Sequence, residues 1–532
     1  MILEDKLRKE TERLWILPET QAGFRKGRSS IDNIFTLKTA TEKVISKERR
    51  KLYVFFADLK AAFDKVNRKK LWKVLEEYGI NKRLIDRIKD IYEETISRVI
   101  MGDKCTSSFR TERGLRQGCP LSPLLFIIFI ANVEDFLKKR QNGGIKIGRK
   151  RIHSLTYADD LAMMAETEKE MKKMMKSLER YLEEKELILN ADKSKMLVIC
   201  KKEKVKQERR WRWKSEIIEE VKEFKYLRFT FNKCNTDEAH IKDVVKRAAA
   251  AMAQIWGIGE RKFGEDYGRR MLMFNIMVKS ILLYGVEIWG WREWKEIETL
   301  QERYIRWMLG LDRCTPGYIV REETKTEQIS IEAGGRVLKY QEKIKRETEN
   351  KILKECRREI NNTEWEKTQW GRRMKMFYEE GRTSQWTREA REDLGANTVE
   401  EWMNIYRERK LEERRRKVEE SKSTKEYKRW KTEGRARYLD QKGKGRKIKT
   451  IARFRCGNEW KGNRYWEEES RKTCRLCGEE ETWQHILKEC PESRTTKTEE
   501  SIMAEEGEGI EWMLELCNRR KEGERRKKKE TR

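Results

Sequence analysis

Prolines, histidines and long apolar runs are scarce in this chain of 532 residues. It contains five prolines and three histidines, and its longest apolar run covers only residues 124–131. A membrane-spanning helix needs ~20 apolar residues, and the charged N-terminus MILEDKLRKE has no apolar core of the signal-peptide type. We therefore expect an intracellular protein without membrane segments, and few candidates for histidine-based acid–base catalysis.

Cysteine is present, but not in the pattern of a disulfide-stabilised domain. The chain has 11 cysteines, an odd number, and they are scattered except near the C-terminus. Small secreted domains that depend on disulfides have dense and usually even sets of cysteines. The cysteine pattern therefore favours a reducing compartment.

Positive charge and aromatic residues are abundant. Lys and Arg number 124 against 93 Asp and Glu, a net charge of +31. Such an excess indicates a polyanionic partner, most often nucleic acid. Because positive and negative residues are both abundant, the alternative is that the charge serves only to keep the chain soluble. Charged residues make up 41% of the chain, which can mean disorder. However, 18 Trp, 16 Tyr and 16 Phe favour a large helical protein with folded cores, and at about 150 residues per domain the length suggests three or four units.

The apolar pattern predicts strands and helices in the first half of the chain. Strands are expected over residues 51–59 and 195–199, a hairpin over 153–166, and a strand pair over 224–231. Helices are expected over 67–78, 82–95 and 168–185, with a long apolar helix running from the loop GLRQGCPLSP to about residue 139. Helices dominate from residue 237 onwards, and the basic tail is expected to be disordered.

Three carboxylates stand out because of where they lie in this pattern. Asp58 ends the first predicted strand, and Asp159 and Asp160 occupy the tip of the predicted hairpin. Clustered carboxylates repel one another unless a cation neutralises them, and Mg²⁺ prefers oxygen ligands. Two such ions about 3.5–4 Å apart can support phosphoryl transfer. The alternative is that the hairpin pair merely caps a turn, but its apolar flanks favour a rigid, buried hairpin.

Six short motifs follow one another along the chain: QAGFRKGRSSIDNI, FADLKAAFD, RQGCPLSP, YADD, LNADKSK and FKYL. The ordered set resembles the reverse transcriptases of non-LTR (LINE-like) retrotransposons, especially arthropod elements, over residues 15–310. This resemblance implies an RNA-directed DNA polymerase that uses two Mg²⁺ (or Mn²⁺) ions, an RNA template, a DNA primer and deoxynucleotides. It also implies a ribonucleoprotein of the nucleus and cytoplasm.

The resemblance further implies an α+β fold of the right-hand polymerase type. Fingers would be partly present in residues 1–50, and the palm and fingers, with an antiparallel sheet and flanking helices, would cover 51–232. A helical thumb over 233–320, a charged helical region or linker over 321–450, a zinc module over 451–500 and a disordered basic tail over 501–532 would follow.

The same resemblance implies roles for individual residues. Asp58 and Asp159 would be the principal metal ligands, with Asp160 beside them. Phe63 would be a steric gate that disfavours a 2′-hydroxyl, ordinary core packing being the alternative. Six further residues would contact the nucleotide or the template: Gln117, Gly118, Lys193, Arg25, Lys26 and Arg28. For Lys193 and the three basic residues of the N-terminal loop, an exposed, solvated position is the alternative.

A second candidate metal site lies near the C-terminus. Cys474, Cys477, His485 and Cys490 form the pattern C-x₂-C-x₇-H-x₄-C. Three thiolates and one imidazole can form a closed, structural, tetrahedral Zn²⁺ site, whereas coincidence is the alternative. Non-LTR elements often carry a CCHC module after the polymerase. Neighbouring Arg and Trp residues in RFRCGNEW and NRYW could contact nucleic acid or pack between helices.

Three departures from the family's pattern lead to competing hypotheses. The usual upstream Arg-Pro-Ile segment and an endonuclease are not visible, and Arg228 stands where a Gly usually follows Tyr-Leu. We therefore expect an N-terminally truncated or degrading copy whose catalytic carboxylates survive. The alternatives are an inactive nucleic-acid-binding remnant, an RNA-templated RNA polymerase (which Phe63 and Ala158 disfavour), and a maturase or telomerase relative.

Overall fold

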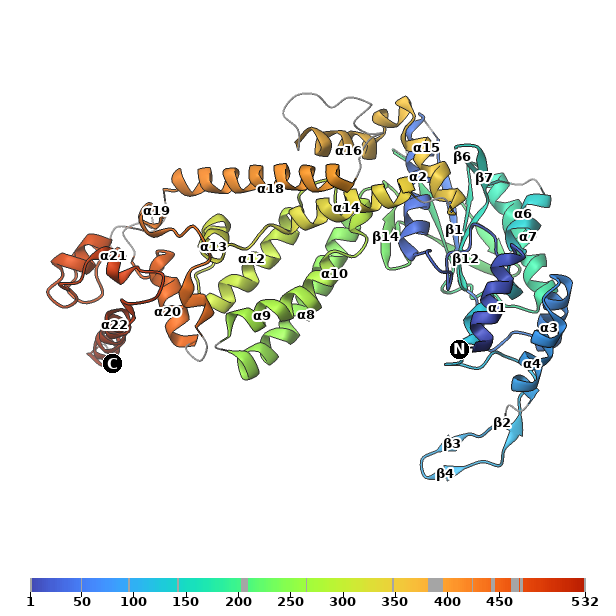
Figure 1. Ribbon diagram of the computed structural model, residues 1–532, viewed down its shortest axis with the longest axis horizontal. Coiled ribbons are helices and arrows are strands. Elements are labelled where there is room, and N and C mark those ends of the chain that lie inside the picture. The colour runs from blue at the N-terminus through green and yellow to red at the C-terminus, as the bar shows by residue number, and fades with distance from the viewer. Residues whose placement is uncertain are drawn as a thin grey trace. The chain divides into compact units, whose positions relative to one another are not determined.

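The computed structural model divides into two compact units (Figure 1). It describes residues 2–530 except 49, 94–95, 141–142, 202–208, 265, 347–348, 381–395, 423, 442–444, 461–467 and 469–471. The first unit comprises Met1–His240, Glu287–Trp289 and Lys339–Met376, and the second comprises Ile241–Val286, Gly290–Leu338 and Phe377–Arg532.

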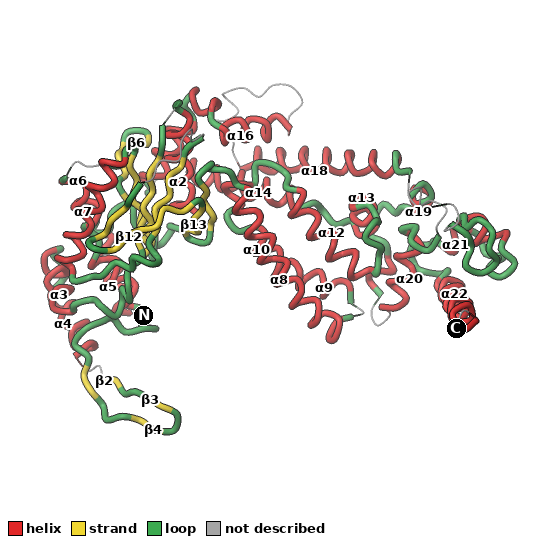
Figure 2. Tube along the Cα trace, turned by 180° about the vertical axis from the view of Figure 1, so that it is seen from behind, coloured by secondary structure: helices red, strands yellow, loops and turns green. Residues whose placement is uncertain are grey.

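A six-stranded sheet forms the centre of the first unit (Figure 2, strands in yellow). Its strand order is β11 (Trp211–Trp213), β12 (Glu216–Val221), β10 (Lys195–Ile199), β1 (Leu52–Ala57), β9 (Asp160–Ala165) and β8 (Ser154–Tyr157). All pairs are antiparallel except β10 with β12. Every residue of β1 is buried, as expected for a central strand that is covered on both faces.

The two faces of β1 have different neighbours. Tyr53 and Phe55 belong to the main apolar core together with Met171 of helix α7 (Glu168–Lys185). On the opposite face, Phe56 stacks on Phe224 of the hairpin β13 (Glu223–Tyr226) and β14 (Phe229–Asn232), with ring centroids 4.3 Å apart. These elements agree with the predicted strands and with the predicted helix over residues 168–185.

Helix α7 begins where its sequence provides a capping box. The Thr167 hydroxyl accepts a hydrogen bond from the Glu170 N–H, and the Glu170 carboxylate accepts one from the Thr167 N–H, both at 3.2 Å. This reciprocal pair satisfies two N–H groups that the first helical turn would otherwise leave without partners. The start of α7 is therefore fixed by local chemistry.

Helices surround the sheet in the first unit. Besides α7, the N-terminal part of this unit contains the helices α1 (Ile2–Arg13), α2 (Ser30–Ser46), α3 (Arg68–Glu77), α4 (Lys82–Glu93), α5 (Leu121–Phe129) and α6 (Val133–Lys139). Four short strand segments, β2 to β5, lie at Ile96–Ser97, Ile100–Met101, Lys104–Cys105 and Phe109–Arg110, and β6 (Ile145–Ile147) pairs with β7 (Lys150–Ile152).

The predicted long apolar helix is interrupted, and this is a correction. Helix α5 ends at Phe129 and α6 begins at Val133, with Asn132 between them. The Asn132 side chain accepts a hydrogen bond of 2.8 Å from the Tyr181 hydroxyl of α7. A turn that presents this amide to α7 replaces the continuous helix, and this tertiary contact is not visible in the local apolar pattern.

A later segment of the chain, residues 339–376, packs with the first unit. It contains the end of α14 (Ile329–Arg346), α15 (Lys351–Ile360), η2 (Thr363–Lys367) and most of α16 (Gln369–Glu380). The Tyr340 hydroxyl donates to Asp32 at 3.0 Å, and the Trp370 ring lies edge-on to Phe35 of α2 at 5.4 Å. The core of this unit is thus completed by residues some 300 positions away in the sequence.

The second unit is helical. It contains most of α8 (Glu238–Phe263), then α9 (Tyr267–Met273), η1 (Phe274–Lys279), α10 (Ser280–Leu282), α12 (Lys295–Leu309), α13 (Gly317–Thr324), α18 (Ala396–Glu419), α19 (Tyr427–Trp430), η3 (Arg437–Asp440), α20 (Gly445–Arg455), η5 (His485–Glu489), α21 (Glu499–Ile502) and α22 (Ile510–Glu530); α11 (Val286–Trp289) lies at the division between the units. None of the helices in the described residues has the length and hydropathy needed to cross a bilayer.

A buried ion pair organises the second unit. The Glu323 carboxylate accepts hydrogen bonds from Arg455 at 2.6 Å, from the Tyr427 hydroxyl at 2.9 Å and from the Tyr438 hydroxyl at 2.8 Å. Glu323 is fully buried and Arg455 is almost so. Breaking such a buried pair costs about 3–5 kcal/mol because one charge is left without a partner.

Two helices, α21 (Glu499–Ile502) and α22 (Ile510–Glu530), lie in the segment for which the sequence predicts a disordered tail. Met513 and Leu516 of α22 are buried. The Trp512 indole N–H donates to the Ser493 carbonyl at 2.9 Å. The many basic residues of this segment indicate disorder, but the start of α22 also carries an apolar stripe that can be buried.

Candidate active site

Asp159 and Asp160 lie at the tip of the β8–β9 hairpin. Tyr157 and Asp160 form its last cross-strand pair, so Ala158 and Asp159 make the turn. Ala158 has a φ of +55°, a left-handed conformation that is uncommon for residues other than glycine. The hairpin predicted from the sequence is confirmed, and its acidic residues occupy the turn and the first position of β9.

The sheet register brings Asp58 to the same place. In the antiparallel pairing of β1 with β9, Ala57 lies opposite Leu161. One further step along both chains places Asp58 opposite Asp160. The backbone of Asp58 is fixed from its other side, because its N–H donates to the Ser194 hydroxyl at 3.0 Å and its carbonyl accepts from the Asn190 N–H at 2.8 Å.

The electrostatics of the hairpin tip reflect this proximity. Burial is the main cause that raises the pKa of Asp159, and the charge of Asp58 adds to the effect. Burial, followed by the charges of Asp159 and Asp58, raises the pKa of Asp160 to about 6. Carboxylates that disfavour one another's ionisation in this way form a site at which a cation is stabilising.

The predicted nucleotide-contacting residues lie on two segments that touch. The Phe63 ring stacks on Phe126 with centroids 4.7 Å apart and is partly buried against the core. Gln117 donates a hydrogen bond to the Asp64 carboxylate at 3.1 Å, and the Leu115 N–H donates to the Phe63 carbonyl at 2.8 Å. Gly118 has a φ of +79°, which glycine adopts without strain.

Lys193 lies in the turn that supports Asp58. Its N–H donates to the Asn190 side chain at 3.4 Å, and its own side chain is exposed. Because Asn190 and Ser194 both bond the backbone of Asp58, the loop carrying Lys193 is attached directly to the strand end that carries the carboxylate.

The three basic residues of the N-terminal loop have different surroundings. Arg25 pairs with Glu12 at 3.1 Å and Arg28 pairs with Glu19 at 2.8 Å, and each of these Arg side chains is only 7% exposed. Lys26 is exposed. The two arginines are therefore engaged within the fold, and Lys26 is the member of the set with an exposed charge.

Arg228 lies at the tip of the β13–β14 hairpin. Tyr226 and Phe229 form the last pair, and the two turn residues Leu227 and Arg228 have φ values of +47° and +64°. Two-residue hairpins with both turn residues in this conformation strongly prefer Asn-Gly and related pairs. The backbone therefore still has the shape that suits glycine, although the sequence provides arginine.

Residues 20–23, to which the sequence assigns no individual role, run along the edge of the acidic hairpin. The Ala22 N–H donates to the Thr156 carbonyl and the Thr156 N–H donates to the Thr20 carbonyl, both at 3.0 Å. The Gln21 side-chain oxygen accepts from the Ala158 N–H at 3.0 Å. The motif QAGF carried the only sequence signal, and nothing local in it indicates a contact 137 residues away.

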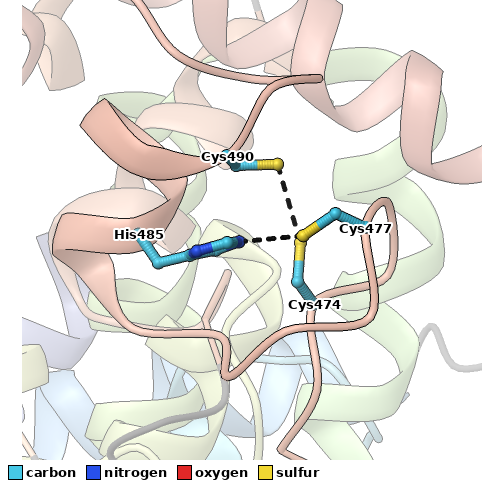
Figure 3. A group of neighbouring side chains, drawn as sticks. All are labelled: Cys474, Cys477, His485 and Cys490. Atoms are coloured by element: carbon cyan, nitrogen blue, oxygen red, sulfur yellow. Dashed lines mark hydrogen bonds between the residues drawn. The ribbon is translucent and has the colours of Figure 1, made fainter.

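The second candidate site gathers Cys474, Cys477, His485 and Cys490, whose side chains point toward one another (Figure 3). Their four ligand atoms all lie within 4.8 Å of one another, with Cys477 Sγ 3.1 Å from His485 Nε2 and Cys474 Sγ 4.0 Å from Cys490 Sγ. Tetrahedral Zn²⁺ with bonds of about 2.0–2.3 Å places its ligand atoms roughly 3.5–3.8 Å apart. The donor set and its spacing therefore fit zinc.

The chain around this cluster is shaped by local turns. Gly478 follows Cys477 with a φ of +90°, and its N–H donates to the Cys474 carbonyl at 3.0 Å. The Cys490 N–H donates to the His485 carbonyl at 2.7 Å. Trp460 of the segment RFRCGNEW is buried and packs on Trp483 at 4.8 Å, and NRYW lies outside the described residues.

In the part of the chain that the structure describes, no other group of three or more Cys, His, Asp or Glu residues is gathered this closely. Asp58, Asp159 and Asp160 influence one another electrostatically, but they are not gathered into such a group.

The first part of the chain is similar to known polymerases. Residues 2–231 match the family "Reverse transcriptase (RNA-dependent DNA polymerase)". The matched stretch contains the sheet, the acidic hairpin, Asp58 and the segments that carry Phe63 and Gln117. Its description agrees with the resemblance that the six motifs indicate.

Curated relatives agree with this match. The chain is 25% identical over 355 residues to the "Probable RNA-directed DNA polymerase from transposon BS" of Drosophila melanogaster, covering 62% of this chain and 37% of that protein. It is 30% identical over 178 residues to the "Retrovirus-related Pol polyprotein from type-1 retrotransposable element R2" of Nasonia vitripennis, covering 32% and 17%. The chain thus spans well under half the length of these relatives.

Solved structures of telomerase show weaker similarity. Apo telomerase from Candida tropicalis matches with a TM-score of 0.34 and 12% identity, covering 76% of this chain and 60% of that one. Telomerase from Candida albicans in complex with a telomeric RNA fragment matches with a TM-score of 0.31 and 12% identity, covering 67% and 57%.

Proposed function

We propose that the first unit is the RNA-directed DNA polymerase of a non-LTR retrotransposon and adds deoxynucleotides to a primer 3′-hydroxyl. One observation carries the proposal: within a stretch that matches reverse transcriptases, the sheet register brings Asp58 beside Asp160 at the hairpin that also carries Asp159. Burial and mutual repulsion raise the pKa of both hairpin carboxylates, so the site is suited to divalent cations. RNA template, DNA primer and deoxynucleotides are the partners proposed.

In this proposal Asp58 and Asp159 hold two Mg²⁺ (or Mn²⁺) ions, with Asp160 beside them. The bound ions would activate the primer 3′-hydroxyl for attack on the α-phosphate and would neutralise charge on the triphosphate and the departing pyrophosphate. The contribution of the protein is positional. Phe63 lies against the sugar, Gln117 and Gly118 border the nucleotide and template, and the Lys193 side chain supplies charge near the phosphates. Of the basic N-terminal loop, Lys26 has the exposed charge that a template backbone can meet, whereas Arg25 and Arg28 hold the loop through Glu12 and Glu19.

Primer extension on an RNA template tests the proposal directly. The purified chain should extend a DNA primer with deoxynucleotides and Mg²⁺, and Asp159→Asn should reduce the rate by more than about 100-fold, because it removes a direct ligand rather than a residue that only orients one. Asp86→Asn, a change at an exposed carboxylate of α4, is the matched control and should extend normally. Equal extension by wild type and Asp159→Asn would remove Asp159 from the metal site.

A catalytically inactive nucleic-acid-binding remnant is the second candidate, and Arg228 favours it. The strained turn at that residue lies in the hairpin that packs on Phe56 of the central strand. This candidate predicts salt-dependent binding of nucleic acid without primer extension. Measurable extension by the wild-type chain eliminates it.

We further propose that Cys474, Cys477, His485 and Cys490 hold a structural Zn²⁺. Three thiolates and one imidazole leave no open position on a tetrahedral ion, so the site would stabilise the fold and not carry out chemistry. The closeness of the four ligand atoms supports this proposal. The zinc content of the purified chain, measured by atomic absorption, should be close to one ion per chain.

A further inference from the structure

The hairpin turn that carries Asp159 leaves one backbone group in need of a partner. In a two-residue hairpin the last cross-strand pair is the one that flanks the turn, here Tyr157 and Asp160. The N–H of the first turn residue, Ala158, lies outside that ladder, and Ala158 is buried. A buried N–H without a partner is costly, so native structures almost always provide one.

Gln21 provides that partner. Its side-chain oxygen accepts the Ala158 N–H at 3.0 Å and the Gly23 N–H at 2.8 Å, and Gln21 is 1% exposed. Because both neighbours are N–H donors, only the oxygen end of the amide can face them. One buried acceptor thus joins the N-terminal segment to the turn.

Gly23 is required by the closeness of the two segments. A Cβ atom built on Gly23 would lie 2.4 Å from the Ala158 nitrogen and 3.0 Å from the Tyr157 carbonyl carbon. Both neighbours are backbone atoms, so neither can rotate out of the way as a side chain could. Any side chain at this position would push the turn away from Gln21.

The edge of the hairpin is attached to the same segment. Thr156 exchanges backbone hydrogen bonds with Thr20 and Ala22 at 3.0 Å, and its carbonyl also accepts from the Asn33 side chain at 2.9 Å. The left-handed conformation of Ala158 costs about 1–2 kcal/mol, and these contacts offset it. The turn therefore owes its shape to residues 20–23 as well as to its own sequence.

We propose that Gln21 and Gly23 are positioning residues that fix the Ala158–Asp159 turn and thereby aim the Asp159 carboxylate at the metal site. This inference rests on the proposed polymerase function. Neither residue contacts nucleotide or metal in this account, and both act through the backbone of the turn.

The test compares Gln21→Met, which keeps the size of the side chain but removes the acceptor, with Thr41→Val. The Thr41 hydroxyl is buried and donates only within α2, to the Leu37 carbonyl at 2.7 Å, so the control loses one buried hydrogen bond away from the turn. Gln21→Met should raise the Mg²⁺ concentration for half-maximal primer extension about 10-fold or more, with unchanged affinity for template–primer. Gln21→Glu, which keeps the acceptor oxygens, should recover part of this loss.

Hydrogen–deuterium exchange of the peptide spanning residues 154–161 gives a readout that needs neither activity nor metal. Gln21→Met and Gly23→Ala should each speed exchange in that peptide, whereas Thr41→Val should leave it unchanged. The inference is overturned if exchange there is unaffected, or if Gln21→Met and Thr41→Val need the same Mg²⁺ concentration. If exchange accelerates as expected but the wild-type chain does not extend primers, the proposed polymerase function fails while the structural role of Gln21 stands.

Discussion

The acidic hairpin of the first unit and the cysteine cluster of the second both present candidate metal ligands, but they are built in different ways. Asp58 and Asp159 are about 100 residues apart and meet only because β1 and β9 pair in one register. The four cysteine and histidine ligands lie within one short segment between Cys474 and Cys490. Pairing of the strands therefore assembles the first site, whereas a metal bound at the second site would itself stabilise the local structure.

The difference extends to geometry. The four ligand atoms of the cysteine cluster lie within 4.8 Å of one another, whereas the carboxylates of the hairpin tip disfavour one another's ionisation. An open, repulsive site can accept ions together with substrate, while a closed thiolate site holds a structural ion. The chain thus pairs one site suited to chemistry with one suited to stability.

The largest effect expected is loss of zinc. Cys477→Ser should reduce the bound zinc to well below one ion per chain and expose residues 472–490 to proteolysis, because structural zinc contributes on the order of 10–16 kcal/mol in zinc-finger peptides. Cys314→Ser, at an exposed cysteine outside the cluster, is the control. Atomic absorption and limited proteolysis provide the measurements, and wild-type zinc content in Cys477→Ser contradicts the assignment.

A smaller effect is expected from protonation at the acidic hairpin. The pKa of Asp160 is raised to about 6 in the folded chain, above about 3.9 in the unfolded chain. The folded state therefore binds the proton more tightly, and this contribution to stability is fully present below pH 4 and is lost as the pH rises through 6. Without Mg²⁺, the unfolding free energy of wild type relative to Asp160→Asn should fall across that window.

Urea unfolding of both proteins between pH 4 and 7 measures this difference. Saturating Mg²⁺ should remove the fall, because the bound cation favours the ionised carboxylate. Parallel pH profiles for wild type and Asp160→Asn in the absence of Mg²⁺ would show that Asp160 is not held in a repulsive cluster.

The smallest effect is expected at the turn that carries Arg228. Arg228→Gly should raise the unfolding free energy by about 0.5–1 kcal/mol, because glycine adopts a φ of +64° without strain. Lys225→Gly, in the adjoining strand β13, should instead destabilise the chain. Thermal denaturation distinguishes the two. A lower melting temperature for Arg228→Gly would mean that the arginine side chain contributes more than its backbone conformation costs.

Much of the first unit could be predicted from the sequence because local chemistry determines it. The apolar run of β1, the hairpin around Asp159 and the capping box of α7 each carry their own signal. The set of cysteine and histidine ligands was equally readable, because its spacing is local. No local pattern indicates that Asp58 lies near the hairpin. Only the order of the six motifs predicts this proximity.

The features that the sequence did not reveal are tertiary. The break between α5 and α6 depends on the Tyr181 hydroxyl reaching Asn132, and the fold of residues 510–530 depends on burying Met513 and Leu516. The contact of Gln21 with Ala158 joins residues 137 positions apart. In each case a long-range contact overrides or completes what local propensity indicates.

Single-turnover incorporation of one deoxynucleotide on an RNA template and DNA primer tests the central claim most directly. Asp58→Asn, Asp159→Asn and the double variant should all lose incorporation, and the double variant should be no slower than the slower single variant, because residues that act as one unit are not additive. The account is contradicted if the wild-type chain incorporates nucleotide and either single variant does so at the same rate, or if the two losses simply multiply.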